Sequence, residues 1–188
     1  MYVYWLSEIK NTPKCSMFFS KKQSIVGIDI GTADIKIAQV SHGAKNTLDT
    51  YGIVNLSYQI TNRDGEAAIQ KTATILKDLL TRAQVTASKC VISLPNSAVF
   101  TSVIEMPKMP DKELEQALQF EAKKYVPLPA SEVVLSWSVV DQNKTENTIS
   151  VLLTAVPKHI RESYVKLFQL SDLDLEIIEI EALALIRS

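Results

Sequence analysis

Hydrophobic and polar residues alternate in several short stretches of the chain and recur at helical spacing in others. The alternating stretches 25–30 and 34–40 flank the turn Gly31-Thr32-Ala33, which predicts a β-hairpin. A third strand is predicted at 50–56. Apolar residues of 66–82 recur every three or four positions, so a helix is expected there.

The remaining pattern predicts a small α+β unit set inside a larger α/β unit. The elements predicted after residue 82 are, in order, strands at 89–94 and 99–105, a helix at 113–125, a hairpin of strands at 133–139 and 149–155, a helix opened by Pro157, a strand at 173–180 and a helix from Glu181. We therefore expect a discontinuous subdomain of 24–96 and 171–188 that is interrupted by an inserted subdomain of 97–170.

Residues 1–23 are expected to be an N-terminal extension. Residues 1–16 lack the basic start and continuous apolar core of a signal peptide. Met17 is followed by Phe-Phe-Ser-Lys-Lys-Gln and then by the first strand, so Met17 is predicted to be the natural start. The alternative is a short amphipathic anchor for a membrane or a partner.

Composition narrows the class of protein. The chain has 188 residues, of which 46% are hydrophobic and 22% charged, and its net charge is −1. These values are typical of a globular protein and give no sign of a nucleic-acid surface. No apolar run is long enough for a membrane span. Cys15 and Cys90 have neither metal-ligand spacing nor a disulfide framework, which fits a reducing cytosol.

The first hairpin carries the charged residues that suggest a ligand site. Asp29 precedes the turn and Lys36 follows it, so a carboxylate and an ammonium flank a tip that presents backbone N–H groups. Such groups suit a phosphate and Mg²⁺. The structural alternative is a buried hairpin with a glycine turn and no ligand.

Six motifs follow one another in the order found in a known family. They are Gly27-Ile-Asp-Ile-Gly31, Val91-Ile-Ser-Leu-Pro95, Glu105-Met-Pro-Lys-Met-Pro110, Phe120-Glu-Ala-Lys-Lys-Tyr-Val-Pro-Leu-Pro129, Val151-Leu-Leu-Thr-Ala-Val-Pro-Lys158 and Ile178-Glu-Ile-Glu-Ala-Leu-Ala-Leu185. Together they resemble the N-terminal half of the PilM family of type IV pilus assembly, in the PilM and FtsA branch of the actin-like ATPase superfamily. The resemblance implies an α/β, actin-like (ribonuclease H-like) lobe 1A with an inserted α+β subdomain 1C, and a second lobe that is absent from the chain.

The resemblance also implies an ATP·Mg²⁺ half-site. Asp29 would hold Mg²⁺ through water, while Gly31, Thr32, Ala33 and Lys36 would contact phosphate. Glu181 would position the attacking water, the role that phosphoryl transfer requires, or would simply favour the start of a helix. At most a weak ATPase is expected in a complete two-lobe protein, and none in this chain.

Asp34 departs from the family pattern, which has a small or hydroxylated residue there. Residues 34 and 36 of a strand point to the same face, so Asp34 is expected either to pair with Lys36 or to join the Mg²⁺ shell.

The partner implied by the resemblance is the N-terminal peptide of a PilN-like inner-membrane protein, and the chain itself and other pilus-assembly components are further candidates. Glu121 and Tyr125 are the predicted partner contacts, on the helical stripe of Leu114 and Leu118. Alternatively, Glu121 flanks the stripe and pairs with Lys124 or Lys158. The protein would be cytoplasmic and peripheral to the inner membrane.

Three other functions stay open. A nucleotide-free peptide-binding adaptor fits the truncation and Asp34. An FtsA-like cell-division protein and a phosphotransferase of the sugar-kinase branch have the same fold.

Overall fold

The computed structural model describes residues 23–56, 65–143 and 147–187. Predictions for the N-terminal extension, including Met17 as the start, lie outside these residues. The chain divides into two compact units. Asn96–Glu162 forms the three-stranded unit, and the described residues of 23–95 and 163–187 form the five-stranded unit.

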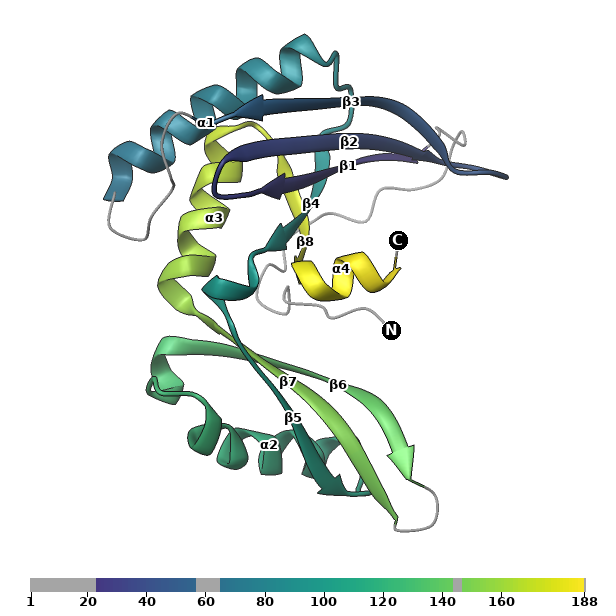
Figure 1. The fold of residues 1–188 in the computed structure, drawn as a ribbon, viewed down its shortest axis with the longest axis vertical. Coiled ribbons are helices and arrows are strands. Elements are labelled where there is room, and N and C mark those ends of the chain that lie inside the picture. The colour runs from purple at the N-terminus through teal and green to yellow at the C-terminus, as the bar shows by residue number, and fades with distance from the viewer. Residues whose placement is uncertain (1–22, 57–64, 144–146, 188) are drawn as a thin grey trace, which may run out of the picture. The chain divides into compact units, whose positions relative to one another are not determined.

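The five-stranded unit is a mixed sheet of order β3-β2-β1-β4-β8, with β1 at its centre (Figure 1). Its strands and helices are β1 (Gln23–Ile30), β2 (Asp34–His42), β3 (Thr47–Asn55), α1 (Gly65–Arg82), β4 (Lys89–Leu94), α3 (Lys158–Leu170, which begins in the other unit), β8 (Asp174–Ile180) and α4 (Glu181–Arg187). The first three strands form an antiparallel meander, whereas β1, β4 and β8 are parallel. The predicted elements of this unit are thereby confirmed.

Alternation along the central strands separates the two faces of this sheet. In β1, Val26, Ile28 and Ile30 are buried, and their paired positions in β2 and β4 are also mostly buried and apolar. Successive residues of a strand point to opposite faces, so the residues between these apolar positions lie on the other face. Burial of one face therefore fixes the register of every strand next to β1.

Cys90 belongs to the buried face of β4. Its side chain is fully buried, and this desolvation raises the pKa of the thiol to about 12. A thiol in such surroundings stays protonated and unreactive. Cys90 is therefore a small residue of the core.

Buried Gln39 connects β2 to the loop before β4. Its side-chain oxygen accepts hydrogen bonds from the backbone N–H groups of Thr86 (2.8 Å) and Ala87 (3.0 Å). Its amide nitrogen donates to Asp49 (3.1 Å) and to the Thr86 hydroxyl (3.0 Å). Both the oxygen and the nitrogen of this buried amide therefore have hydrogen-bond partners inside the fold. The same hydrogen bonds anchor the loop that leads into β4.

The three-stranded unit is an antiparallel sheet of order β5-β7-β6 with one helix, α2, packed on it (Figure 1). Its elements are β5 (Phe100–Pro107), α2 (Asp111–Tyr125), β6 (Val133–Asn143) and β7 (Thr148–Pro157), with short 3₁₀ turns at Asn96–Ala98 and Ala130–Glu132. Leu114 and Leu118 of α2 are buried in one core with Val151 and Leu153 of β7. Trp137 packs partly buried against this core, as its alternating pattern predicts.

The ends of two elements of this unit refine the expectations. Pro157 is the last residue of β7, opposite Val133, and α3 begins at the next residue, Lys158, so the helix expected at Pro157 is present. Proline has no backbone N–H to donate to a neighbouring strand, and at the end of a strand this loss interrupts no further pairing. Tyr125 is 46% exposed and does not continue the buried stripe of α2, which runs through Ala122 to Val126.

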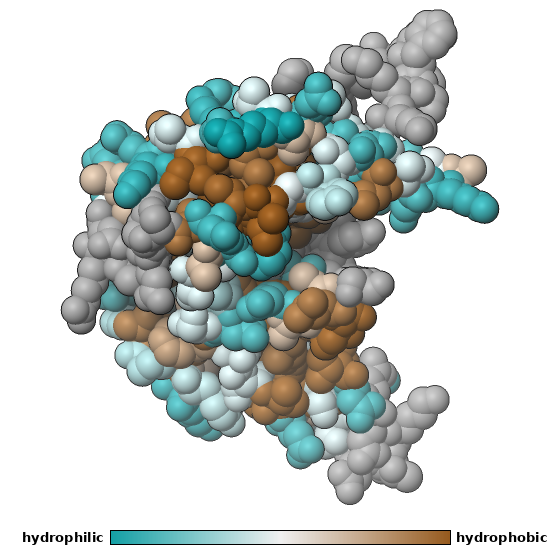
Figure 2. Space-filling view, turned by 45° about the horizontal axis from the view of Figure 1, so that its top comes forward, coloured by the Kyte–Doolittle hydropathy of each residue, from teal (hydrophilic) through white to brown (hydrophobic). Residues whose placement is uncertain are grey.

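Some large hydrophobic side chains remain on the surface. Figure 2 shows such side chains gathered in patches among hydrophilic ones on the face that it draws. The exposed large hydrophobic residues of the five-stranded unit are Leu48, Tyr51 and Ile53 on β3, Leu170 on α3, and Leu185 and Ile186 on α4; those of the three-stranded unit are Val103, Phe120, Tyr125 and Val140. Contiguous exposed apolar surface is typical of sites where another molecule binds.

Gly52 of β3 leaves room for a side chain of α1 where the helix packs on the sheet. A Cβ atom at this position would lie 2.9 Å from Cδ1 of Leu79, a residue of α1 that is itself buried. We expect Gly52→Ala to lower the free energy of unfolding by about 1–3 kcal/mol, the usual cost of overpacking a core. Urea denaturation measures this change.

Gly43→Ala is the matched control, because a Cβ there would make only an ordinary contact with the Lys45 carbonyl oxygen at 3.7 Å. Equal stability of the two variants would show that α1 does not pack this closely on β3.

Candidate functional site

Three polar side chains form a row on the five-stranded sheet, on the face opposite to the buried apolar residues of β1. Asp29 of β1 is paired with Lys36 of β2 on one side and with Ser93 of β4 on the other. Paired residues of neighbouring strands point to the same face, which here is opposite to the buried apolar face. The row lies near the carboxyl ends of the parallel strands β1 and β4, the edge at which open α/β sheets bind ligands.

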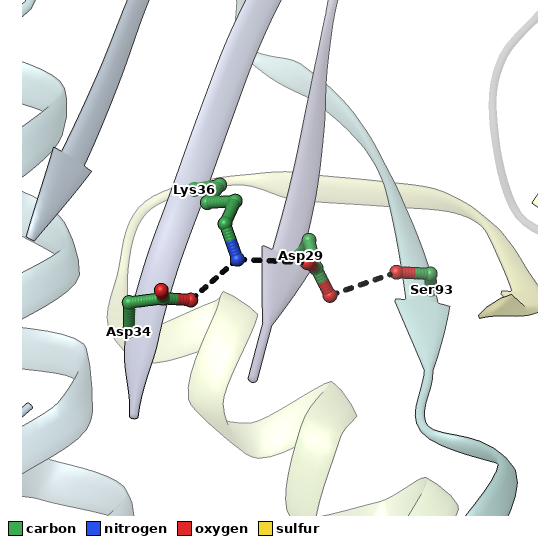
Figure 3. A network of polar contacts seen from close by, with 4 residues as sticks. All are labelled: Asp29, Asp34, Lys36 and Ser93. Carbon is green, nitrogen blue, oxygen red and sulfur yellow. Dashed lines mark hydrogen bonds and ion pairs between the residues drawn. The ribbon is translucent and has the colours of Figure 1, made fainter. Parts of the chain in front are cut away.

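The ammonium of Lys36 lies between two carboxylates (Figure 3). Its Nζ is 2.6 Å from Oδ1 of Asp34 and 3.7 Å from Oδ2 of Asp29. The hydrogen bond to Asp34 is the main cause that raises the pKa of Lys36 above its ordinary value. Of the two roles that the sequence left open for Asp34, the structure shows the pairing with Lys36.

Ser93 orients the other oxygen of Asp29. Its hydroxyl donates a hydrogen bond of 3.2 Å to Oδ1 of Asp29 (Figure 3). Ser93 belongs to one of the six motifs, but nothing in its local pattern assigns it a role. Only the parallel pairing of β1 with β4 shows that it stands beside Asp29.

The hairpin turn is tight and closed by its own backbone. The Gly31 N–H donates to the carbonyl oxygen of Asp34 at 2.9 Å, and the carbonyl oxygen of Ala33 accepts from Leu56 N–H at 2.7 Å. Thr32 and Ala33 are exposed at the tip. The Gly31 amide is thus engaged within the turn, so the tip amides of Thr32 and Ala33 are the better candidates for an anion.

Tyr164 of α3 is a further polar group near the row. Desolvation, with a smaller contribution from the negative charge of Asp29, raises the pKa of this phenol to about 12. The hydroxyl consequently stays protonated at neutral pH and can donate a hydrogen bond. Nothing in the local sequence around Tyr164 indicates that it lies near Asp29.

Glu181 begins α4 directly after β8. Ile180, the residue before it, is paired with Leu94 of β4. Glu181 therefore follows the carboxyl end of β8, on the same edge of the sheet as Asp29. It is separated from β1 by the intervening strand β4.

Asp29 fits the requirements of a magnesium ion bound through water. Mg²⁺ keeps several waters and is usually held by one or two carboxylates together with substrate phosphates. The carboxylate of Asp29 is 41% exposed and has a fixed orientation from Ser93. Among the described residues no group of three or more His, Cys, Asp or Glu side chains could enclose a metal.

Glu121 and Tyr125 lie one turn apart on α2 of the three-stranded unit. Nζ of Lys124 donates to both carboxylate oxygens of Glu121, at 2.8 and 2.9 Å. This is the structural alternative that the sequence left open for Glu121. Tyr125 is exposed, as is Phe120, over whose ring the Lys123 ammonium lies 5.5 Å from the centroid.

Comparison with known proteins decides the family. Residues 27–188 match the family model described as type IV pilus assembly protein PilM. The chain belongs to the PilM family. A solved structure described as the PilM-PilN type IV pilus biogenesis complex is 25% identical in sequence, with a TM-score of 0.76. The match covers 85% of this chain and 48% of that one, so the chain spans about half the length of its relative.

A second solved structure supports the fold. The cytoplasmic domain of EpsL, an inner membrane component of the type II secretion system of Vibrio cholerae, matches with a TM-score of 0.53 and 13% identity. This match covers 83% of the chain and 57% of that domain. The predicted α/β fold of the actin-like type is confirmed. None of the helices within the described residues has the length and apolar character needed to cross a membrane.

The ion pairs of the row contribute little to folding. Lys36 is 51% exposed, and exposed ion pairs are worth about 0–1 kcal/mol. We therefore expect Lys36→Gln to change the free energy of unfolding by less than about 1 kcal/mol in urea denaturation. A loss of several kcal/mol would instead make Lys36 a structural residue and would prevent its use in binding tests.

Proposed function

We propose that the protein is a PilM-like scaffold of type IV pilus assembly that binds ATP·Mg²⁺ through the first hairpin and recruits an inner-membrane partner through α2. The single observation that carries the nucleotide part is the row of Lys36, Asp29 and Ser93 beside an exposed turn. The chain would supply half of the nucleotide site. Residues 97–170 would correspond to subdomain 1C, and 24–96 with 171–188 to subdomain 1A.

Each group of the hairpin has a part in this proposal. Lys36 would place its positive charge on the phosphates, and the amides of Thr32 and Ala33 would bind phosphate oxygens. Asp29 would orient the waters of Mg²⁺. Glu181, at the same edge of the sheet, would position water if the complete protein hydrolyses ATP.

The partner part rests on the family and on an exposed aromatic surface. In the 25% identical solved structure, PilM is in complex with PilN. Tyr125 and Phe120 expose apolar rings on α2, and aromatic residues are enriched among the groups that dominate binding energy at interfaces. A PilN-like N-terminal peptide is the proposed ligand, and a cytoplasmic protein held at the inner membrane by that ligand is the proposed location.

One observation favours a second function, that of a nucleotide-free peptide-binding adaptor. The carboxylate of Asp34 already forms an ion pair with the ammonium of Lys36, which a phosphate would need as its partner. In that case α2 would keep its role and the hairpin would be structural.

Calorimetry with ATP·Mg²⁺ tests the nucleotide part. We expect Lys36→Gln to weaken binding roughly tenfold or more, because hydrogen bonds to charged groups are worth about 1.5–3 kcal/mol. Asp29→Asn should weaken binding chiefly when Mg²⁺ is present. Lys77→Gln is the matched control, since Lys77 is also half exposed and paired with a carboxylate, that of Asp172. Equal affinity of all these variants would place the nucleotide elsewhere.

Titration with a synthetic peptide of the PilN N-terminal segment tests the partner part. Tyr125→Ala should weaken peptide binding by about tenfold, as expected for loss of an anchoring aromatic side chain. Tyr51→Ala, which removes an exposed tyrosine from β3, should leave the affinity unchanged. Peptide binding without ATP binding would favour the adaptor, and unchanged peptide binding by Tyr125→Ala would exclude α2 as the contact.

A further inference from the structure

Asp34 occupies the position from which an anion would contact Lys36. Its Oδ1 accepts a hydrogen bond from Nζ of Lys36 at 2.6 Å, whereas Asp29 lies 3.7 Å from the same nitrogen. Asp34 is therefore the principal partner of the ammonium, and Asp29 is the secondary one. A phosphate that binds Lys36 must share the ammonium with Asp34 or displace it.

The backbone of the turn holds Asp34 in this place. Its carbonyl oxygen accepts from Gly31 N–H at 2.9 Å. A Cβ atom at Gly31 would lie 3.2 Å from Oδ1 of Asp34, so the carboxylate is folded back over the glycine. With its side chain only 25% exposed, Asp34 is better covered than Lys36, whose side chain is 51% exposed.

Electrostatics at the hairpin consequently disfavours a free anion. Two carboxylates, Asp29 and Asp34, flank one ammonium, so the cluster has a net negative charge at neutral pH. A phosphate that approaches Lys36 meets this negative charge at short range. A divalent cation can compensate for it by binding to the phosphate and to the carboxylate that the phosphate displaces.

We propose that Asp34 determines the affinity and metal dependence of the phosphate site by acting as a built-in competitor for Lys36. This inference rests on the nucleotide part of the proposed function. It makes nucleotide binding weak when Mg²⁺ is absent and stronger when Mg²⁺ accompanies the phosphates.

The test compares ATP binding by the full-length protein and its Asp34→Ser and Asp34→Asn variants, each with Mg²⁺ and with a chelator. Both variants should bind metal-free ATP about fivefold more tightly than the unmodified protein, as removal of an exposed ion pair and a like charge implies. The gain should be smaller with Mg²⁺. Asp78→Asn, which removes an exposed carboxylate paired with Arg82 on α1, should leave binding unchanged.

A second readout does not depend on nucleotide. Since Asp34 is the main cause that raises the pKa of Lys36, the pKa of the Lys36 side chain should fall in both variants when it is followed by NMR. Metal-free ATP binding that is equal or weaker in Asp34→Ser, or an unchanged pKa of Lys36, would overturn the competitor role and leave the nucleotide site standing. Absence of ATP binding in every protein, the variants included, would overturn both.

Discussion

The register of β1 between β2 and β4 controls which residues lie on the face of the sheet opposite to the buried apolar one. Val26, Ile28 and Ile30 must face the core, and this requirement sends Asp29 to the opposite side. The same constraint on β2 and β4 brings Lys36 and Ser93 beside it. A slip of one residue would bury Asp29 and expose the isoleucines, so the apolar core and the polar row are specified together.

The polar row depends on the core, but the core hardly depends on the row. Burial of apolar surface dominates folding, whereas half-exposed ion pairs such as that of Lys36 contribute little. The sequence of the hairpin can therefore change its charges without loss of the fold. Asp34 illustrates this freedom, because it alters the electrostatics of the turn while the strands around it remain paired as the apolar pattern requires.

Local patterns predicted most of the fold, since alternation and helical spacing are properties of neighbouring residues. The hairpin around Gly31 and the strand of Cys90 were predicted in this way, and the pairing of Asp34 with Lys36 was one of two alternatives that the hairpin left open. The pairing of Asp29 with Ser93 was not, because it joins parallel strands 64 residues apart along the chain. Tyr125 was wrongly placed on the buried stripe of α2. The helix ends at Tyr125, and Val126, in an extended conformation, is the residue that is buried there. The role of Glu181 follows from the resemblance and that of Glu121 from its place on the helical stripe, and both remain predictions.

The most direct test of the site is an NMR titration of the ¹⁵N-labelled protein with ATP·Mg²⁺ that follows the backbone amides. If the hairpin holds the phosphates, the largest shifts will fall on Thr32, Ala33 and Lys36, with smaller ones at Ser93 across the β1–β4 pair. Saturable binding that leaves these amides unmoved and shifts others would contradict a nucleotide site on this face of the sheet.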